Sequence, residues 1–287
     1  VRLRYETILL DAYPDGLVAL GTLRERSALV RVWRALNARA YRGAQHIIVI
    51  GRDMIGLLHD RYGVDRRHVT YIPHWGPKEA EGMPAERGSL LARLGLDRKF
   101  VVQYSGNMGL WHDMEALVRV AEHLRNDDRI HFLFMGKGRR REAAETLARR
   151  LKLTNITWLD FAPREELATA LASCDAALIS LRAGMEGVAV PSKLYGILAA
   201  GRPVLAMVPP NSEVGQTVRE EGCGCVVPPG DVEGMVRAIR ELAATPAIAE
   251  EMGHRARAAY SAKYTIDHAA NAYRRLWAAS DQDEMPD

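Results

Sequence analysis

The segment VPSKLYGILAAGRP at Val190–Pro203 places a lysine at the start of a predicted helix. Pro191 leads into the helix, Ser192 suits the N-cap position, and Lys193 follows in the first turn. Gly201 marks the end of the helix, ahead of an apolar run. Because unpaired N–H groups and the helix dipole favour an anion at a helix start, the segment predicts a diphosphate site. An ordinary strand–helix crossover with a surface lysine accounts for it equally well.

Two glycine-bearing turns follow predicted strands. In the turn SGNMG, Gly106 and Gly109 flank Asn107, so that backbone N–H groups can approach a phosphate closely. His112 comes shortly afterwards. In the turn GKG, Lys137 lies between two glycines and precedes three arginines, a pattern that is more typical of a solvated helix start.

Two further turns carry candidate ligand contacts. Phe161 begins the apolar turn FAP, which either holds a nucleobase or simply starts the helix at Arg164. Glu186 lies in a flexible turn shortly before Pro191. All of these turns come at the carboxyl ends of predicted parallel strands, where open α/β sheets bind their ligands. Their shared location favours a binding site more than any single motif does.

Other chemistries have weak support. No G-x-S-x-G motif surrounds Ser105, and the dinucleotide fingerprint G-x-G-x-x-G is absent. The three cysteines are too sparse for a disulfide framework and suit a reducing cytosol, and we expect no metal site among them. The acidic stretch Asp281–Asp283 resembles a carboxylate pair for a metal, but we expect it in a disordered tail.

Strand-like and helix-like runs alternate along the chain, which predicts a parallel α/β architecture. We expect a partial domain at residues 1–76, a linker at 77–93, a complete doubly wound domain at 94–262, a helix at 263–280 and a tail at 281–287. The first domain holds these predicted elements: strands Thr7–Leu10, His46–Ile50 and Val69–Ile72, and helices Arg24–Arg42 and Arg52–Tyr62. The second holds these predicted strands: Phe100–Tyr104, Ile130–Met135, Ile156–Leu159, Ala176–Leu181, Val204–Val208 and Gly224–Val227.

The composition limits the number of hydrophobic cores and the classes of binding partner. With 287 residues and 48% hydrophobic content the chain can bury two cores. A net charge of +3 does not by itself indicate nucleic-acid binding. No apolar run reaches the length of a membrane span, and no signal peptide is visible. Because the chain starts at Val1, we expect a missing upstream segment.

Together these motifs resemble the retaining glycosyltransferases of the GT-B fold, in particular the family 4 branch that builds capsule, O-antigen and exopolysaccharide chains. The matching pieces, in the order of that family, are LDAYPD at Leu10–Asp15, VIGRDM at Val49–Met54, IPHW at Ile72–Trp75, YSGNMG at Tyr104–Gly109, the lysine segment at Val190–Pro203 and the closing helix region Tyr264–Trp277. The resemblance implies two Rossmann-like domains, of which the N-terminal one lacks its first strands here.

The resemblance also implies roles for residues. The donor diphosphate would be held by backbone N–H groups of Gly106–Gly109 and Pro191–Leu194, together with Lys193. Asp11 would face the transferred sugar, although a turn-capping aspartate fits it at least as well. Two positions depart from the family. The usual E-x7-E glutamates fall at Val188 and Gly196. The arginine and lysine of the first phosphate loop fall at Asn107 and His112.

The resemblance implies transfer of a sugar from a UDP- or GDP-sugar to a glycan or lipid-linked acceptor, with retention and without metal or cofactor. Two alternatives stay open: a truncated or half-enzyme chain that binds nucleotide but is inactive alone, with a partner chain completing the N-terminal domain, and a GT-B nucleotide-sugar epimerase. We expect a cytoplasmic protein that makes no contact with nucleic acid. The arginines and apolar residues of Arg24–Arg42 indicate peripheral contact with anionic lipid at the inner face of the membrane, and a solvated helix packed by its apolar side is as good an account.

Overall fold

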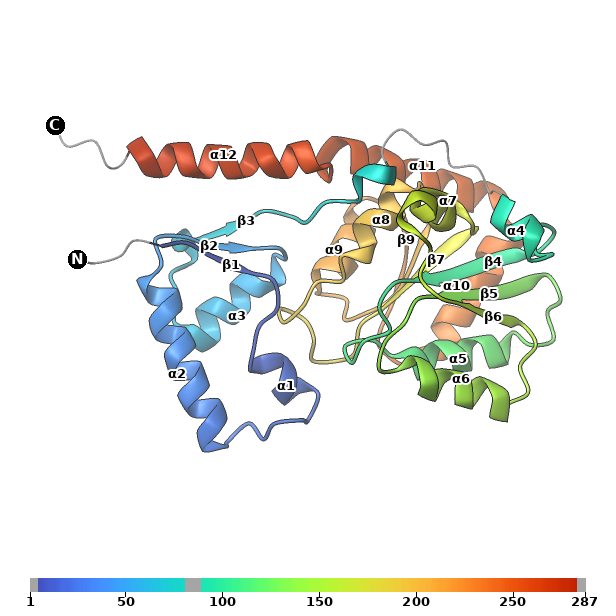
Figure 1. Ribbon diagram of the computed structural model, residues 1–287, viewed down its shortest axis with the longest axis horizontal. Helices are drawn as coiled ribbons and strands as arrows, with labels where there is room; N and C mark the ends of the chain where they lie inside the picture. The colour runs from blue at the N-terminus through green and yellow to red at the C-terminus, as the bar shows by residue number, and fades with distance from the viewer. Residues whose placement is uncertain (1–4, 81–88, 283–287) are drawn as a thin grey trace.

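Two separate parallel sheets form the framework of the chain (Figure 1). The computed structural model describes residues 5–80 and 89–282. The smaller sheet has the strand order β1-β2-β3, and the larger has the order β6-β5-β4-β7-β8-β9. The strands are β1 (Thr7–Leu9), β2 (Ile47–Val49), β3 (Val69–Tyr71), β4 (Phe100–Ser105), β5 (Ile130–Met135), β6 (Ile156–Leu159), β7 (Ala176–Ser180), β8 (Val204–Met207) and β9 (Gly224–Val227).

The strands predicted from apolar runs are confirmed to within a residue at each end. The order of the larger sheet reverses between β4 and β7, which is the switch point of a doubly wound sheet. Such a sheet is buried on both faces, so its strands are continuous apolar runs that stand out in the sequence.

Helices cover both faces of the larger sheet. The helices are α1 (Asp15–Ala19), α2 (Ala28–Gly43), α3 (Asp53–Tyr62), α4 (Ser89–Arg93), α5 (Met114–His123), α6 (Arg141–Arg150), α7 (Leu167–Ala172), α8 (Lys193–Ala199), α9 (Glu213–Glu220), α10 (Val232–Ala244), α11 (Pro246–Lys263) and α12 (Ile266–Gln282), with short 3-10 turns η1 (Arg66–His68), η2 (Lys78–Ala80) and η3 (Arg164–Glu166). Val102 of β4 packs toward α5, α6 and α10, whereas the adjacent Val101 packs toward α7, α8, α9 and α11.

The start of α2 differs from the prediction. The helix begins at Ala28 and not at Arg24, because Ser27 caps it by accepting a hydrogen bond of 3.3 Å from the N–H of Val30. The short helix α1 was not predicted, because it spans only Asp15–Ala19 and carries no periodic pattern.

The C-terminal helix α12 crosses back over the smaller sheet (Figure 1). Ile48 and Ile72 of this sheet pack against Ala269 of α12, and the indole N–H of Trp277 donates to Glu6 at 2.6 Å. The helix runs to Gln282, so Asp281 and Gln282 are helical and not part of a disordered tail as expected. Asp283 lies outside the described residues.

Strand β1 is the outer strand of the smaller sheet among the residues described. Leu9 is buried, but the flanking Ile8 and Leu10 are each more than half exposed. Of the predicted linker at 77–93, residues 77–80 and 89–93 are described and contain η2 and α4, and residues 81–88 lie outside the described residues.

Candidate functional site

A cleft of about 460 Å³ lies at the carboxyl edge of the larger sheet, where the loop after β1 reaches it. The N–H of Ala12 donates to the carbonyl of Val188 at 2.8 Å, and Asp11 pairs with Ala189 in an antiparallel bridge. The cleft is lined by Asp11, Pro77, Ser105, Gly106, Asn107, Trp111, His112, Phe161, Leu167, Leu171, Leu181, Ala189, Val190, Pro191, Ser192, Lys193 and Gly196.

Lys193 brings a cation to the middle of this lining. Its Nζ lies 3.6 Å from the ring centroid of Tyr104 and 3.5 Å from the carbonyl oxygen of Asn107. The Tyr104 hydroxyl donates to the same carbonyl at 2.8 Å, which fixes the ring beneath the ammonium group. Burial lowers the pKa of Lys193 well below its ordinary value. A negatively charged ligand beside Nζ would oppose that effect and stabilise the charged form.

Two glycine turns support this arrangement sterically. Gly106 has φ +133°, and a Cβ there would lie 3.3 Å from the Lys193 Cε. Gly136 has φ +130°, and a Cβ there would lie 2.0 Å from the carbonyl oxygen of Gly106. A Cβ on Gly138 would lie 2.4 Å from the carbonyl oxygen of Met108. The GKG turn therefore serves as the close-packed support of the SGNMG turn.

The backbone donors of the two turns are only partly available. The N–H of Gly106 donates to Met135, that of Met108 donates to Lys137, and that of Leu194 donates to Pro191. This corrects the expectation that all these N–H groups face a phosphate, because internal turn bonds already use three of them. Within the described residues, no backbone acceptor is recorded for the N–H groups of Asn107, Gly109, Ser192 or Lys193.

Ser192 occupies the N-cap position of α8, as predicted, but its side chain makes no cap hydrogen bond. Its backbone lies in the helical region, with φ −60° and ψ −19°, and not in the extended conformation of a side-chain cap. The exposed Ser192 side chain is thus left at the cleft lining together with the buried Pro191.

His112 is buried at the wall of the cleft. Its Nδ1 lies 2.5 Å from the carbonyl oxygen of Ser180, so Nδ1 carries the proton and donates. Burial, with the nearby Lys193 charge, lowers the pKa of His112 to about 3. The ring is therefore neutral at physiological pH, and its Nε2 is a hydrogen-bond acceptor.

The turn after β6 and the helix α7 bring apolar side chains to the cleft. Phe161 is more than half exposed at the lip of the cleft, and Leu167 and Leu171 lie beside it. A Cβ on Gly196 would lie 3.4 Å from the Leu171 Cδ1, so the glycine at this position leaves the floor of the cleft open. Val188 stands where the first glutamate of the E-x7-E pair would be. Its side chain is buried in the core between the sheets, where an apolar residue fits.

Three of the remaining candidates lie outside the cleft. Lys137 forms an ion pair with Asp160 at 3.0 Å on the surface, and Glu186 is exposed in the turn before α8. Gly109 lines an adjoining hollow. Burial raises the pKa of Asp11, which does line the cleft. Among the described residues, no group of three or more His, Cys, Asp or Glu side chains is placed to hold a metal ion.

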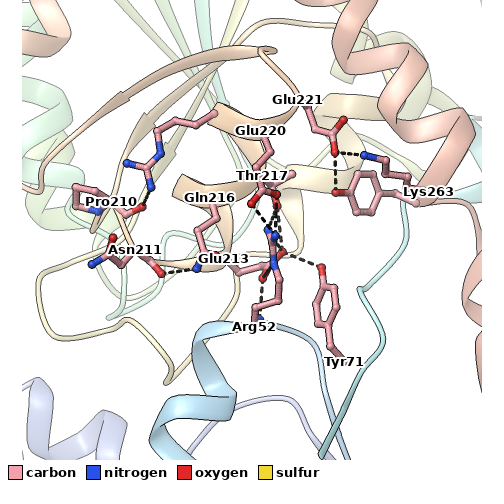
Figure 2. A network of polar contacts seen from close by, with 12 residues as sticks. Arg52, Tyr71, Pro210, Asn211, Glu213, Gln216, Thr217, Glu220, Glu221 and Lys263 are labelled. Carbon is pink, nitrogen blue, oxygen red and sulfur yellow. Dashed lines mark hydrogen bonds and ion pairs between the residues drawn. The ribbon is translucent and has the colours of Figure 1, made fainter.

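A buried ion-pair network fastens the smaller sheet to the larger one beside this cleft (Figure 2). The Arg52 backbone N–H and Nε donate to Oε2 of Glu213 at 2.7 and 3.0 Å, and Nη2 donates to Oε1 at 3.0 Å. Tyr71 donates to the same carboxylate at 2.8 Å, and Thr217 donates at 3.0 Å. Arg52 also contacts Glu220 at 2.7 Å. These contacts satisfy a carboxylate whose side chain is fully buried.

Asp53, next to Arg52, also joins the two parts of the chain. Its Oδ2 accepts a hydrogen bond of 2.8 Å from the N–H of Gly187, whereas its buried Oδ1 has no hydrogen-bond partner in the described part of the chain. Burial is the main cause that raises the pKa of Asp53 to about 6.

Sequence reasoning missed several residues of the site. Tyr104 was identified only as part of the YSGNMG motif, and Trp111 was missed, although a tryptophan two positions after a glycine-rich turn is a usable signal. Glu213 gives no such signal, because its partner Arg52 is 161 positions away in the chain.

Comparisons with known proteins agree with this geometry. Residues 99–245 match the family model described as glycosyl transferases group 1. WbjE of Pseudomonas aeruginosa, described as a probable glycosyltransferase, is 31% identical over 233 residues, which cover 81% of this chain and 58% of that protein. The colanic acid biosynthesis glycosyl transferase WcaI of Escherichia coli K12 is 27% identical over 242 residues, with coverage of 82% and 59%. The chain thus spans less than two thirds of the length of either relative.

Solved structures share the fold. Anabaena Alr3699/HepE in complex with UDP gives a TM-score of 0.78 at 15% identity, over 98% of this chain and 73% of that one. WaaG, a glycosyltransferase involved in lipopolysaccharide biosynthesis, gives 0.77 at 15% identity, over 94% and 75%. The GT-B fold expected from the sequence is confirmed. No helix in the part of the chain that the structure describes is long and apolar enough to cross a membrane.

Proposed function

The chain belongs to the group 1 glycosyl transferases, and on this premise we propose that it transfers a sugar from a nucleotide-sugar to a glycan or lipid-linked acceptor in polysaccharide synthesis. The relatives WbjE and WcaI carry glycosyltransferase descriptions, and WcaI is assigned to colanic acid biosynthesis. A UDP- or GDP-linked hexose is the proposed donor, as HepE is solved with UDP and with UDP-glucose.

The position of Lys193 is the observation that carries this proposal. Its Nζ, in contact with the Asn107 carbonyl, lies among backbone N–H groups that have no recorded acceptor in the described residues. A cation, and amides that make no backbone hydrogen bond within the described residues, suit a diphosphate in a cleft at the carboxyl edge of a parallel sheet. Exposed Phe161 and its leucine neighbours offer an apolar surface for the base.

The sugar would lie in the cleft within reach of Asp11 and His112, which both line it. Because the His112 ring is neutral and protonated on Nδ1, its Nε2 would accept a hydrogen bond from a sugar hydroxyl. Asp11, on the loop after β1, would orient the sugar or the acceptor hydroxyl.

The reaction breaks the bond between the anomeric carbon and the phosphate oxygen and forms one to the acceptor oxygen. The acceptor proton passes to the departing diphosphate, which assists attack from the same face and gives retention. Lys193 and the amides stabilise the negative charge that develops on the diphosphate, an effect that is strongest in a preorganised, partly dry site.

Helix α2 supports a second part of the proposal, peripheral contact with anionic lipid from the cytoplasmic side. Leu29, Val32 and Leu36 lie on one face of α2 and are each more than half exposed, and Arg31 and Arg39 are exposed beside them. Apolar side chains flanked by cations are typical of helices that lie in the membrane interface.

A product assay tests the transferase proposal. The protein is incubated with UDP- and GDP-hexoses and with lipid-linked and oligosaccharide acceptors, and the products are identified by mass spectrometry. Sugar transfer to an acceptor with release of the nucleoside diphosphate is the expected result. An epimerised donor with no transfer would instead show that the cleft opens and closes the donor.

A further inference from the structure

A second hollow, of about 290 Å³, adjoins the donor cleft and shares Asn107 and Trp111 with it. Residues of both sheets' loops line it, namely Tyr13, Leu17, Asn107, Gly109, Leu110, Trp111, Gly138 and Arg139. Tyr13 lies next but one to Asp11, on the loop that reaches the proposed sugar end of the cleft. A molecule in this hollow would thus lie beside the transferred sugar.

Aromatic rings dominate the wall of the hollow. The rings of Tyr13 and Trp111 are 6.0 Å apart and tilted by 58°, and Trp33 stacks behind Tyr13 at 6.5 Å and 13°. Tyr13 is 37% exposed. Trp111 packs so closely on α1 that a Cβ on Gly16 would lie 2.6 Å from its ring. The hollow therefore presents aromatic surface to solvent at the junction of the two sheets.

The loop that carries Tyr13 is firmly anchored. Asp15 is buried and accepts hydrogen bonds from Arg34 at 2.7 Å, from Arg61 at 2.5 Å and from Tyr62. These partners hold the pKa of Asp15 below its usual value, against the opposing effect of burial. The Tyr13 carbonyl also accepts a hydrogen bond of 2.5 Å from Asn37. An exposed aromatic ring on so rigid a loop loses little conformational entropy when it binds a ligand.

The charge of the hollow is positive. None of its lining residues is a carboxylate, and Arg139 supplies one guanidinium group. The neighbouring Arg141 forms ion pairs with Glu145 and Asp160, whereas no ion pair is recorded for Arg139 within the described residues. Arg139 is exposed and can bind an anionic group.

We propose that this hollow is the subsite for an acceptor saccharide that bears an anionic group. A pyranose ring would stack its C–H face against Tyr13 and Trp111, whose negative π faces attract polarised C–H groups. The Asn107 amide would bind ring hydroxyls, and Arg139 would pair with a carboxylate or phosphate on the saccharide. This inference rests on the proposed transferase function, because it assigns the second substrate of the same site.

Saturation-transfer NMR tests the subsite with the donor cleft filled by UDP. The probes are methyl α-glucopyranoside, glucuronic acid and glucose 6-phosphate, so that neutral, carboxylate and phosphate sugars are compared. We expect binding of the two anionic probes to the wild type, about tenfold weaker binding in Tyr13→Ala, and unchanged UDP affinity. Tyr5→Ala is the matched control, because Tyr5 is also 39% exposed but lies outside the hollow.

The Arg139→Gln variant tests whether the positive charge of Arg139 binds the anionic group of the saccharide. It should lose affinity for the anionic probes by about tenfold while binding methyl α-glucopyranoside like the wild type. Equal binding by wild type and Tyr13→Ala, displacement of UDP by the sugars, or no binding of any probe would each overturn the subsite. If UDP did not bind at all, the proposed function would fall, and a Tyr13-dependent sugar signal measured without UDP would still support the subsite.

Discussion

Arg52 forms a two-point ion pair with the buried Glu213 carboxylate between the two sheets, with Nε–Oε2 and Nη2–Oε1 distances of 3.0 Å each. Glu213 is the first residue of α9, and Arg52 precedes α3 in the smaller domain. The pair therefore sets how the loop after β2 meets the larger sheet, alongside the Asp53–Gly187 contact.

Arg52→Ala should destabilise the protein by about 3–5 kcal/mol, because it leaves the buried Glu213 carboxylate without its cation. Urea unfolding measures this loss. Arg67→Ala is the control, since Arg67 pairs with Asp65 on the surface and such pairs contribute about 0–1 kcal/mol. Equal effects of the two substitutions would contradict the assignment of Arg52 and Glu213 as the fastening between the sheets.

Gly136→Ala should disrupt the SGNMG turn, whose backbone we propose binds the donor diphosphate. The new Cβ would lie 2.0 Å from the Gly106 carbonyl oxygen at φ +130°, so backbone strain of about 1–3 kcal/mol adds to a clash with backbone. We expect reduced stability and weaker UDP binding. Gly95→Ala, at φ +68° with open space around it, carries the strain of about 1–2 kcal/mol alone and should leave UDP binding intact. UDP affinity that is unchanged in Gly136→Ala would show that the turn does not depend on this packing.

Asp53 should make stability depend on pH. Its pKa is raised to about 6 from an ordinary value of 3.8, so between these values the folded state binds more protons than the unfolded state. The wild type therefore loses stability as pH rises from about 4 to about 6 relative to Asp53→Asn. The asparagine keeps an acceptor for the Gly187 N–H without the charge. If the unfolding free energies of both proteins changed with pH in parallel, the raised pKa of Asp53 would be refuted.

Much of this fold was predictable because each piece of evidence for it is local. The strands of the larger sheet are short apolar runs between turns, and Lys193 directly follows a recognisable turn. The support that Gly136 gives to Gly106 could not be predicted, because it depends on the spacing of two neighbouring strands. Lys137 was expected among the donor contacts, but its side chain lies outside the cleft, paired with Asp160.

Flotation with vesicles tests the exposed face of α2. At low salt the protein should float with vesicles rich in phosphatidylglycerol and stay at the bottom with phosphatidylcholine. Arg31→Glu with Arg39→Glu should abolish flotation, because each basic residue near an anionic surface contributes about 1 kcal/mol. Arg66→Glu with Arg67→Glu provides the matched charge change in η1, away from α2. If both double variants float equally, α2 is not the contact surface.

Titration calorimetry with UDP on wild type, Lys193→Ala and Lys137→Ala tests the central claim most directly. Both lysines follow strands of the larger sheet, but only Lys193 lines the cleft. Loss of a charge-assisted contact of about 1.5–3 kcal/mol predicts that Lys193→Ala binds UDP roughly tenfold to a hundredfold more weakly, while Lys137→Ala binds like the wild type. Wild-type affinity in Lys193→Ala, or an equal loss in Lys137→Ala, would contradict the assignment of this cleft as the donor site.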